Sequence, residues 1–394
     1  MKLKNISLCI AAILSTQFNT AIADPISEAL IDDSKVNFQI RGRYETVDQL
    51  SDSQDLFSFR SRLTYQTGDI YNFFGLAELD DVRATNEKPW IADYSYTEIN
   101  QSFLGYKVSN DTLLKYGRQR ILLDNQRFVG GVGFRQNEQT YDAFSVKSQE
   151  IKNLTAFYSY VTNVNRIFSE ESGKSDHRNS TNLVNVKYTP NNWANLSAYA
   201  YLIDNNDVER FSTDTYGVRL AGKGELDVLK LEYAFEYAKQ KNGSNNPLSY
   251  DADYQLFESG IGYKEINLKL SYEILGSDDG SAGFITPLAT LHSFQGWTDK
   301  FLFNGAGNWD KGIRDFYISM SGKFLGMQLL AVHHQFESDI DNIDMGNEWG
   351  VSLTYPFADY YSVSAKYASF SGADSGYSFS DDADKFWLTL EAKF

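Results

Sequence analysis

The feature that most constrains the fold is a strict alternation of apolar and polar residues, which recurs along most of the chain. In residues 228–239, Leu229 and Leu231 fall on one face of an extended segment, whereas Lys230 and Glu232 fall on the other. A period of two residues predicts a β-strand with one apolar and one polar face. Repeated segments of this kind predict an all-β chain.

The lengths of the connections decide which all-β class fits. Eighteen strands are expected near residues 35–47, 55–67, 71–82, 97–107, 111–121, 139–148, 152–162, 180–189, 193–203, 212–221, 228–239, 251–263, 266–274, 312–322, 325–337, 347–355, 359–370 and 384–394. The connections between them alternate between short turns and long loops, and the longest loop spans residues 277–311. Outer-membrane barrels sort their connections in this way, and a water-soluble β-sandwich has no reason to do so. We therefore predict a transmembrane antiparallel up-and-down β-barrel of about 18 strands, with short periplasmic turns and long extracellular loops.

Composition agrees with a barrel that crosses a membrane. Aromatic residues make up 15% of the chain, as expected for strands with aromatic girdles at both membrane interfaces. After the N-terminal region no run of apolar residues is long enough for a helical span. All six prolines fall in predicted connections, because proline cannot donate a hydrogen bond within a closed sheet.

The N-terminus predicts export. Lys2 and Lys4 precede an apolar run, and Ala21-Ile22-Ala23 forms a typical signal peptidase site. We expect residues 1–23 to be a cleaved signal peptide and residues 24–394 to form a single outer-membrane barrel domain. The cell outer membrane is therefore the predicted location.

Charge and the C-terminus indicate the partners. A net charge of −16 argues against nucleic-acid binding. The only cysteine, Cys9, lies in the leader, so neither a disulfide nor a thiolate metal site is expected. Phe394 ends a strand whose apolar face also includes Phe386 and Leu388, as is typical of barrels recognised by the barrel-assembly machinery. Outer-membrane lipid and lipopolysaccharide are the other expected partners.

The inward faces of so wide a barrel carry its function. On the first two predicted strands four arginines oppose apolar residues, and a fifth follows on a later strand: Arg41, Arg43, Arg60, Arg62 and Arg219. They either form a neutralised ion-pair ladder in a hydrated pore or select anions, because guanidinium fits carboxylates in a bidentate manner. If they face water, replacing Arg60 and Arg62 with glutamate reduces anion preference and leaves folding intact.

Other chemistry has little support in the sequence. Asp339, Asp341 and Asp344 lie close together on a predicted loop and are a weak calcium candidate, without the glycine and distal glutamate of an EF-hand. His333 and His334 must point to opposite faces of one strand, and no catalytic histidine with an orienting partner can be identified. We expect neither an enzyme nor a cofactor.

Two stretches resemble the alginate export family of porins. The first is Tyr116-Gly117-Arg118-Gln119-Arg120 with Asn125-Gln126-Arg127-Phe128 and the run from Phe134-Arg135 to Asp142-Ala143. The second is Thr286-Pro287-Leu288-Ala289-Thr290-Leu291-His292 with Gly296-Trp297-Thr298-Asp299. The resemblance implies an eighteen-stranded barrel with an arginine-rich path for polyanions, lined by Arg41, Arg43, Arg60, Arg62, Arg118, Arg120, Arg127 and Arg135.

One conflict accompanies this resemblance. Arg118 and Arg120 share the parity of Leu114 and Tyr116, which should face lipid. Either a bulge near Gly117 resets the register or both arginines lie above the membrane. The leading hypothesis is a passive channel for polar, anionic solutes or saccharides. A general uptake porin and a plugged structural or adhesive barrel are the alternatives.

Overall fold

A computed structural model of the chain describes residues 25–50, 52–168, 175–302, 309–373 and 381–394. After a short helical segment, α2 (Pro25–Ser27) and η1 (Glu28–Asp32), eighteen strands follow. They are β1 (Lys35–Gln49), β2 (Asp52–Gln66), β3 (Phe73–Ala84), β4 (Tyr96–Lys107), β5 (Thr112–Gln119), β6 (Thr140–Ser148), β7 (Leu154–Asn165), β8 (Asp176–Asn191), β9 (Ala194–Ile203), β10 (Thr213–Leu226), β11 (Leu229–Asn242), β12 (Asp251–Tyr263), β13 (Ile266–Leu275), β14 (Ile313–Phe324), β15 (Met327–Glu337), β16 (Asp344–Phe357), β17 (Tyr361–Ser371) and β18 (Ala383–Lys393). Four short 3-10 or π turns complete the described elements, namely η1, η2 (Glu209–Phe211), η3 (Leu291–Ser293) and η4 (Trp309–Lys311).

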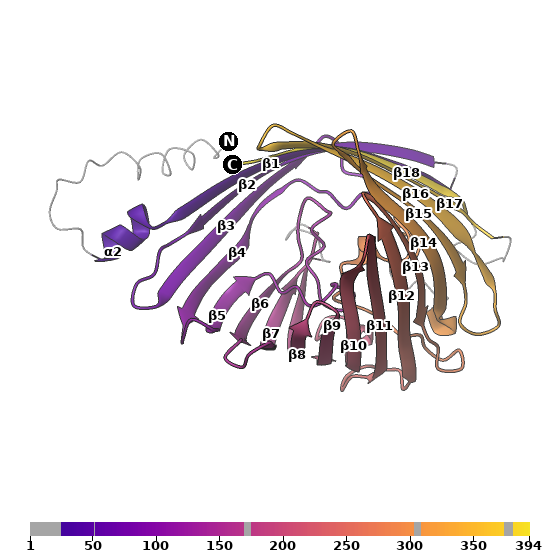
Figure 1. The fold of residues 1–394 in the computed structure, drawn as a ribbon, viewed down its shortest axis with the longest axis horizontal. Helices are drawn as coiled ribbons and strands as arrows, with labels where there is room; N and C mark the ends of the chain where they lie inside the picture. The colour runs from indigo at the N-terminus through magenta and orange to yellow at the C-terminus, as the bar shows by residue number, and fades with distance from the viewer. Residues whose placement is uncertain (1–24, 51, 169–174, 303–308, 374–380) are drawn as a thin grey trace.

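The strands form one closed sheet (Figure 1). Each strand pairs antiparallel with the next in the chain, and β1 pairs with both β2 and β18. The predicted eighteen-stranded up-and-down barrel is confirmed. Closure gives every wall strand a pairing partner on both sides, as a membrane requires.

The two faces of each strand have opposite environments. On β1, Val36, Phe38 and Tyr44 are exposed on the outside, whereas Arg43 and Glu45 are buried on the inside. Exposed apolar residues and buried charged residues invert the pattern of a water-soluble protein. The predicted facing of the strands is therefore confirmed on β1.

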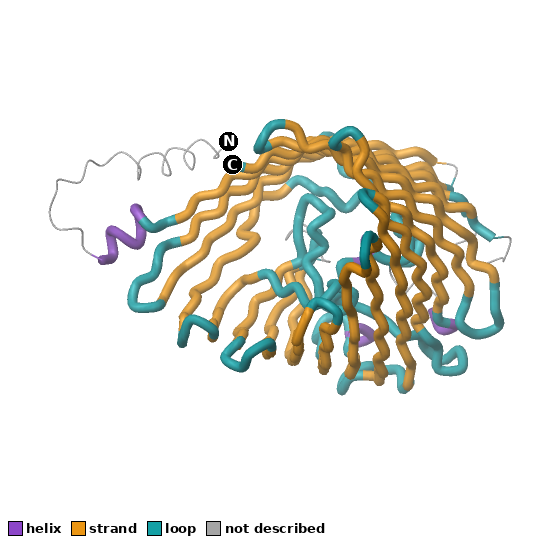
Figure 2. The backbone as a smooth tube through the Cα atoms, viewed as in Figure 1, coloured by secondary structure: helices purple, strands orange, loops and turns teal. Residues whose placement is uncertain are grey.

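Two long loops fold into the barrel, as the loop segments inside the ring of strands in Figure 2 show. We call them L3 (residues 120–139) and L7 (the described residues 276–302 and 309–312). They pair with each other through the bridge between Val129 and Leu288, and the Gly130 amide donates to the Leu288 carbonyl at 2.8 Å. Phe128 and Phe284 pack with wall residues in the largest apolar cluster, so both loops are part of the core.

Burial of the inward residues changes along the barrel axis. On β10, Thr213 and Thr215 near the extracellular end are buried, whereas Lys223 and Glu225 near the periplasmic end are exposed. The assignment of the two ends follows from the short turns and both termini, which lie on the periplasmic side in barrels of this kind. The loops therefore narrow the extracellular half and leave a wider, hydrated periplasmic vestibule.

Two details differ from the sequence prediction. Pro190 and Pro356 lie within β8 and β16 rather than in connections. Both occupy the periplasmic ends of their strands, and Pro190 lies where the register with β9 shifts, so the sheet tolerates them.

The predicted signal peptide, including Cys9, lies outside the described residues. Among the residues that are described, no helix is long and apolar enough to span a membrane.

Candidate functional site

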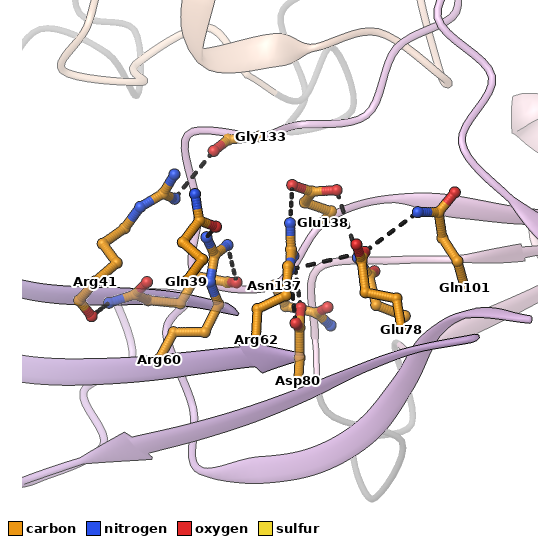
Figure 3. Close-up of polar contacts among 12 residues, drawn as sticks. Gln39, Arg41, Arg60, Arg62, Glu78, Asp80, Gln101, Gly133, Asn137 and Glu138 are labelled. Carbon is orange, nitrogen blue, oxygen red and sulfur yellow. Dashed lines mark hydrogen bonds and ion pairs between the residues drawn. The ribbon is translucent and has the colours of Figure 1, made fainter. Parts of the chain in front are cut away.

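Four predicted arginines lie side by side on the inner wall. The register of β1 and β2 places Arg41 opposite Arg60 and Gln39 opposite Arg62. Arg43 lies two residues further along β1, opposite Ser58, and all four arginines face inward. L3 covers them, so their partners come from both the wall and the loop (Figure 3).

Arg62 and Arg120 share the carboxylate of Glu138 at the end of L3. Figure 3 shows Arg62 between this carboxylate and Asp80. Arg62 lies 2.5 Å from Asp80 and 2.7 Å from Glu138. Arg120 also pairs with Glu78 at 2.5 Å. Burial alone would raise the pKa of Glu138, but the two guanidinium groups outweigh it and lower this pKa to about 2. Glu138 is therefore an anion near pH 7 that ties L3 to Arg62 of β2, while Arg120 ties the start of L3 to Glu78 of β3.

Arginines also hold the backbone of L3. Arg60 donates to the Gln136 carbonyl at 2.9 Å, and Arg41 donates to the Gly133 carbonyl at 3.2 Å while pairing with Glu391 at 2.9 Å. A guanidinium group has five donors in a fixed fork, which suits it to such multiple contacts.

The middle of L3 is fastened in the same way. Arg127 pairs with Glu273 of β13 at 2.7 Å, and Arg135 pairs with Glu45 of β1 at 2.9 Å and with Asp299 of L7 at 3.2 Å. L3 thus crosses the lumen and reaches several walls of the barrel.

Most of the predicted arginines are therefore anchors with partners. Arg43 lies 3.7 Å from Asp93 and 4.3 Å from the centre of the Phe134 ring, and Arg219 pairs with Glu236 at 2.6 Å. Arg60 is 0% exposed, so the prediction that Arg60 and Arg62 face water is wrong, because L3 covers them. The geometry agrees with the alternative of a neutralised ion-pair ladder.

The prediction that Arg118 lines the path for anions is wrong. Arg118 lies on the outer wall, where its register neighbours are Ser102 and Asp142, and its Nε donates to Asp142 at 2.9 Å. Gly117 has a φ of 124°, yet this irregularity does not turn Arg118 inward. Arg120 faces the lumen instead, because β5 ends at Gln119 and the chain then enters L3.

L7 is fastened to the wall by side chains of β16 and β18. The Glu348 carboxylate of β16 accepts hydrogen bonds from the backbone amides of Trp297 and Thr298. Asp299 pairs with Lys385 at 3.1 Å and with His292 at 2.7 Å. Burial lowers the pKa of His292 to about 3, so its ring is neutral near pH 7.

The predicted substrate path contained only arginines and left out the lysines of the vestibule. Ten lysines lie near the periplasmic ends of their strands, at alternate positions that face the lumen. They are Lys35, Lys107, Lys115, Lys147, Lys187, Lys223, Lys230, Lys269, Lys323 and Lys393. The signal was present in the alternation, for example at Lys147 beside the outward-facing Phe144 and Val146. The prediction favoured arginines because guanidinium binds carboxylates in a bidentate manner. In the structure, most of these lysines are more exposed than the arginines on the inner wall.

The weak calcium candidate does not assemble. Asp339 accepts from the Ser277 amide at 3.0 Å, Asp341 pairs with Lys311, and Asp344 accepts from the Gly346 amide at 2.9 Å. The three carboxylates are thus engaged separately. No group of three or more metal-ligating side chains is found in the part of the chain that the structure describes.

The histidines follow the prediction from strand parity. His333 contacts the outward-facing Trp349, with ring centroids 4.2 Å apart. His334 lies on the inner face, where it pairs with Asp315 at 2.9 Å.

A closed eighteen-stranded barrel with a polar, loop-narrowed lumen defines the class as an outer-membrane porin for polar solutes. The sequence model for alginate export matches residues 34–270, and the chain belongs to the alginate export family. No curated protein sequence matches the chain.

Solved structures show the same fold. OccAB4 of Acinetobacter baumannii has a TM-score of 0.72 at 15% identity, covering 92% of this chain and 98% of its own. OpdK of Pseudomonas aeruginosa, solved with vanillate, has a TM-score of 0.71 at 15% identity, with 93% and 99% covered. OccK9 (OpdG) of the same organism has a TM-score of 0.71 at 16% identity, with 93% and 100% covered. At such identities these likenesses concern the fold.

Proposed function

We propose that this porin prefers anionic solutes and that carboxylated saccharides are among its cargo. The observation that carries the proposal is the set of ten vestibule lysines defined above. These cations face the periplasmic end of the lumen, whereas most arginines of the predicted path are engaged by carboxylates or, like Arg60, by a carbonyl of L3. Clustered charge of one sign in a channel with low-dielectric walls concentrates counter-ions.

The densest part of this set lies on neighbouring strands beneath L3. Lys115 of β5 and Lys147 of β6 are diagonal neighbours on the inner face, because Lys115 lies opposite Ser145 and Lys147 lies opposite Leu113. Lys187 of β8 follows, 3.8 Å from Asp124 of L3. Lys115 lies 4.5 Å from the centre of the buried Phe103 ring. This contact holds the Lys115 side chain against the wall.

Carboxylates compensate only part of this positive charge. Inward-facing acids in the same region of the described strands are Glu225, Glu232, Glu258 and Glu391. Two of them pair with lysines, Glu258 with Lys269 at 3.0 Å and Glu391 with Lys393 at 3.2 Å. Lys107 also pairs with Asp69 at 2.5 Å, and Lys187 lies 3.8 Å from Asp124. These six acids are fewer than the ten lysines, which supports a net positive vestibule although the chain has a net charge of −16.

Reversal potentials in a salt gradient test the ion preference. We expect the wild-type channel to prefer chloride over potassium, and Lys115→Glu with Lys147→Glu to lower that preference several-fold. Lys152→Glu, in the exposed periplasmic turn after β6, is the matched control and should leave it unchanged. Cation preference in the wild type would contradict the proposal.

Block of the current by polymers tests the cargo. Oligouronate should reduce the conductance from the periplasmic side, and neutral dextran of equal length should not. Equal block by both would favour the general porin, and absence of any conductance would favour the plugged barrel. The fastening of L7 inside the lumen is the observation that keeps this plugged alternative open to test.

A further inference from the structure

The outer wall of the barrel carries a cavity that solute passage does not use. It has a volume of about 650 Å³ and lies between β3 and β7. β4 pairs with β5 only from Ser102 to Lys107, because β5 ends early and the chain turns into L3. The extracellular part of β4 therefore has β3 as its only strand neighbour, and the wall is indented on its lipid-facing side.

The cavity has an apolar row and a polar row. In four strands the residue nearer the periplasm is apolar and the residue two positions closer to the extracellular end is polar: Ile99 and Thr97 on β4, Tyr116 and Arg118 on β5, Phe144 and Asp142 on β6, and Tyr160 and Thr162 on β7. The apolar residues are exposed, and Tyr116 is 72% exposed. The same order of an apolar and a polar residue recurs on four neighbouring strands. This repetition indicates an amphipathic site rather than a packing defect.

The polar row offers both signs of charge. Arg118 donates to both carboxylate oxygens of Asp142, at 2.9 and 3.3 Å, and to the Ile99 carbonyl at 3.0 Å. The side chains of Arg118 and Asp142 remain 21% and 33% exposed. A guanidinium group suits a phosphate, and carboxylates suit the divalent cations that phosphorylated headgroups bind.

We propose that this cavity binds one acylated, phosphorylated glycolipid of the outer leaflet, a molecule of the lipid A type. The apolar row faces outward, where lipid surrounds a membrane barrel. The polar row lies toward the extracellular end, so the headgroup belongs to the outer leaflet. An acyl chain lies along the Tyr116, Phe144 and Tyr160 row, and the phosphorylated sugar contacts Arg118 and Asp142.

Native mass spectrometry of the full chain in detergent tests the site. Lipid A is titrated against the delipidated wild type, Ser102→Phe and Ser259→Phe. Ser102 is exposed and lines the cavity, so a phenylalanine there fills it. Ser259 is an equally exposed outward residue of β12, far along the sheet, and serves as the control. We expect one tightly bound lipid A, at least tenfold weaker binding to Ser102→Phe, and no change for Ser259→Phe.

A second comparison needs no variant. Lipid A should bind the wild type at least tenfold more tightly than phosphatidylethanolamine does. Equal affinity for the two lipids, unchanged binding by Ser102→Phe, or a dimer that excludes lipid from this face would overturn the proposal. Heat-dependent migration on gels confirms that the variants are folded. Ser102→Phe should conduct normally, so loss of this site is distinguishable from loss of the channel.

Discussion

Glu138 joins two cations that come from different parts of the chain. Arg62 belongs to β2 and Arg120 to the start of L3, and both pair with this one carboxylate. A buried charge that loses its partner is costly, so each of the three residues depends on the others. L3 is thus held by a network rather than by a single contact.

Replacing Glu138 with glutamine should loosen L3. Hydrogen bonds to charged groups contribute about 1.5–3 kcal/mol each, and Arg62 keeps Asp80 while Arg120 keeps Glu78. We expect a folded barrel whose single-channel current is larger and noisier than that of the wild type. Glu337→Gln, at the exposed rim of β15, should leave the current unchanged. A quiet, wild-type trace from Glu138→Gln would show that this network does not hold L3.

The same carboxylate predicts how the channel responds to acid. Its pKa of about 2 in the folded protein is below the value of about 4.3 for an unperturbed glutamate. Its stabilising contribution is therefore fully present above about pH 4.3 and is lost as the pH falls through about 2. We expect steady currents from pH 7 to 5 and rising noise below pH 3. In Glu138→Gln the noise should already be present at pH 7.

At the scale of elements, the strands could be predicted and the inward loops could not. Strand facing follows from local alternation, as at Arg43 and Tyr44, because each residue's environment is set by its parity. The placement of L3 depends on contacts such as Arg127 with Glu273 and Arg135 with Asp299, whose partners are distant in the sequence. Alternation also predicted the wrong side for Arg120, because β5 ends at Gln119 and residues beyond a strand need not alternate between its faces.

One wall carboxylate, Glu348, accepts several hydrogen bonds from L7. Glu348 receives two backbone amides and the Thr298 hydroxyl. Glu348→Ala should release this part of L7, because the buried amides lose their partner. We expect conductance to rise and a protease added outside to cleave L7 in this variant. If the wild type is cleaved equally fast, the loop is not fastened as the structure indicates.

For the whole molecule, the seam between the first and last strands completes the wall. Phe394 exchanges backbone hydrogen bonds with Phe38 at 2.8 and 3.1 Å, and its ring lies 5.7 Å from that of Tyr360. Phe394 therefore contributes to the seam, in addition to its predicted recognition by the assembly machinery.

Deletion of Phe394 should lower the yield of folded barrel in the outer membrane. Phe324→Ser is the control, because Phe324 is an exposed aromatic residue at another periplasmic strand end. We expect the deletion to reduce the heat-modifiable form several-fold and the control to leave it intact. Equal yields would remove the terminal residue from the assembly step.

The central claim is that neighbouring residues of one strand touch water inside and lipid outside. Ser321 and Met320 of β14 are adjacent, with opposite parity, and Met320 is an exposed outward residue. The only natural cysteine is Cys9, so Ser321→Cys and Met320→Cys each introduce a single thiol into the barrel. The decisive measurement is the single-channel conductance before and after a charged, membrane-impermeant thiol reagent is added. We predict that the reagent changes the current of Ser321→Cys and leaves that of Met320→Cys unaffected. Equal reaction of both, or reaction of Met320→Cys alone, would contradict the account.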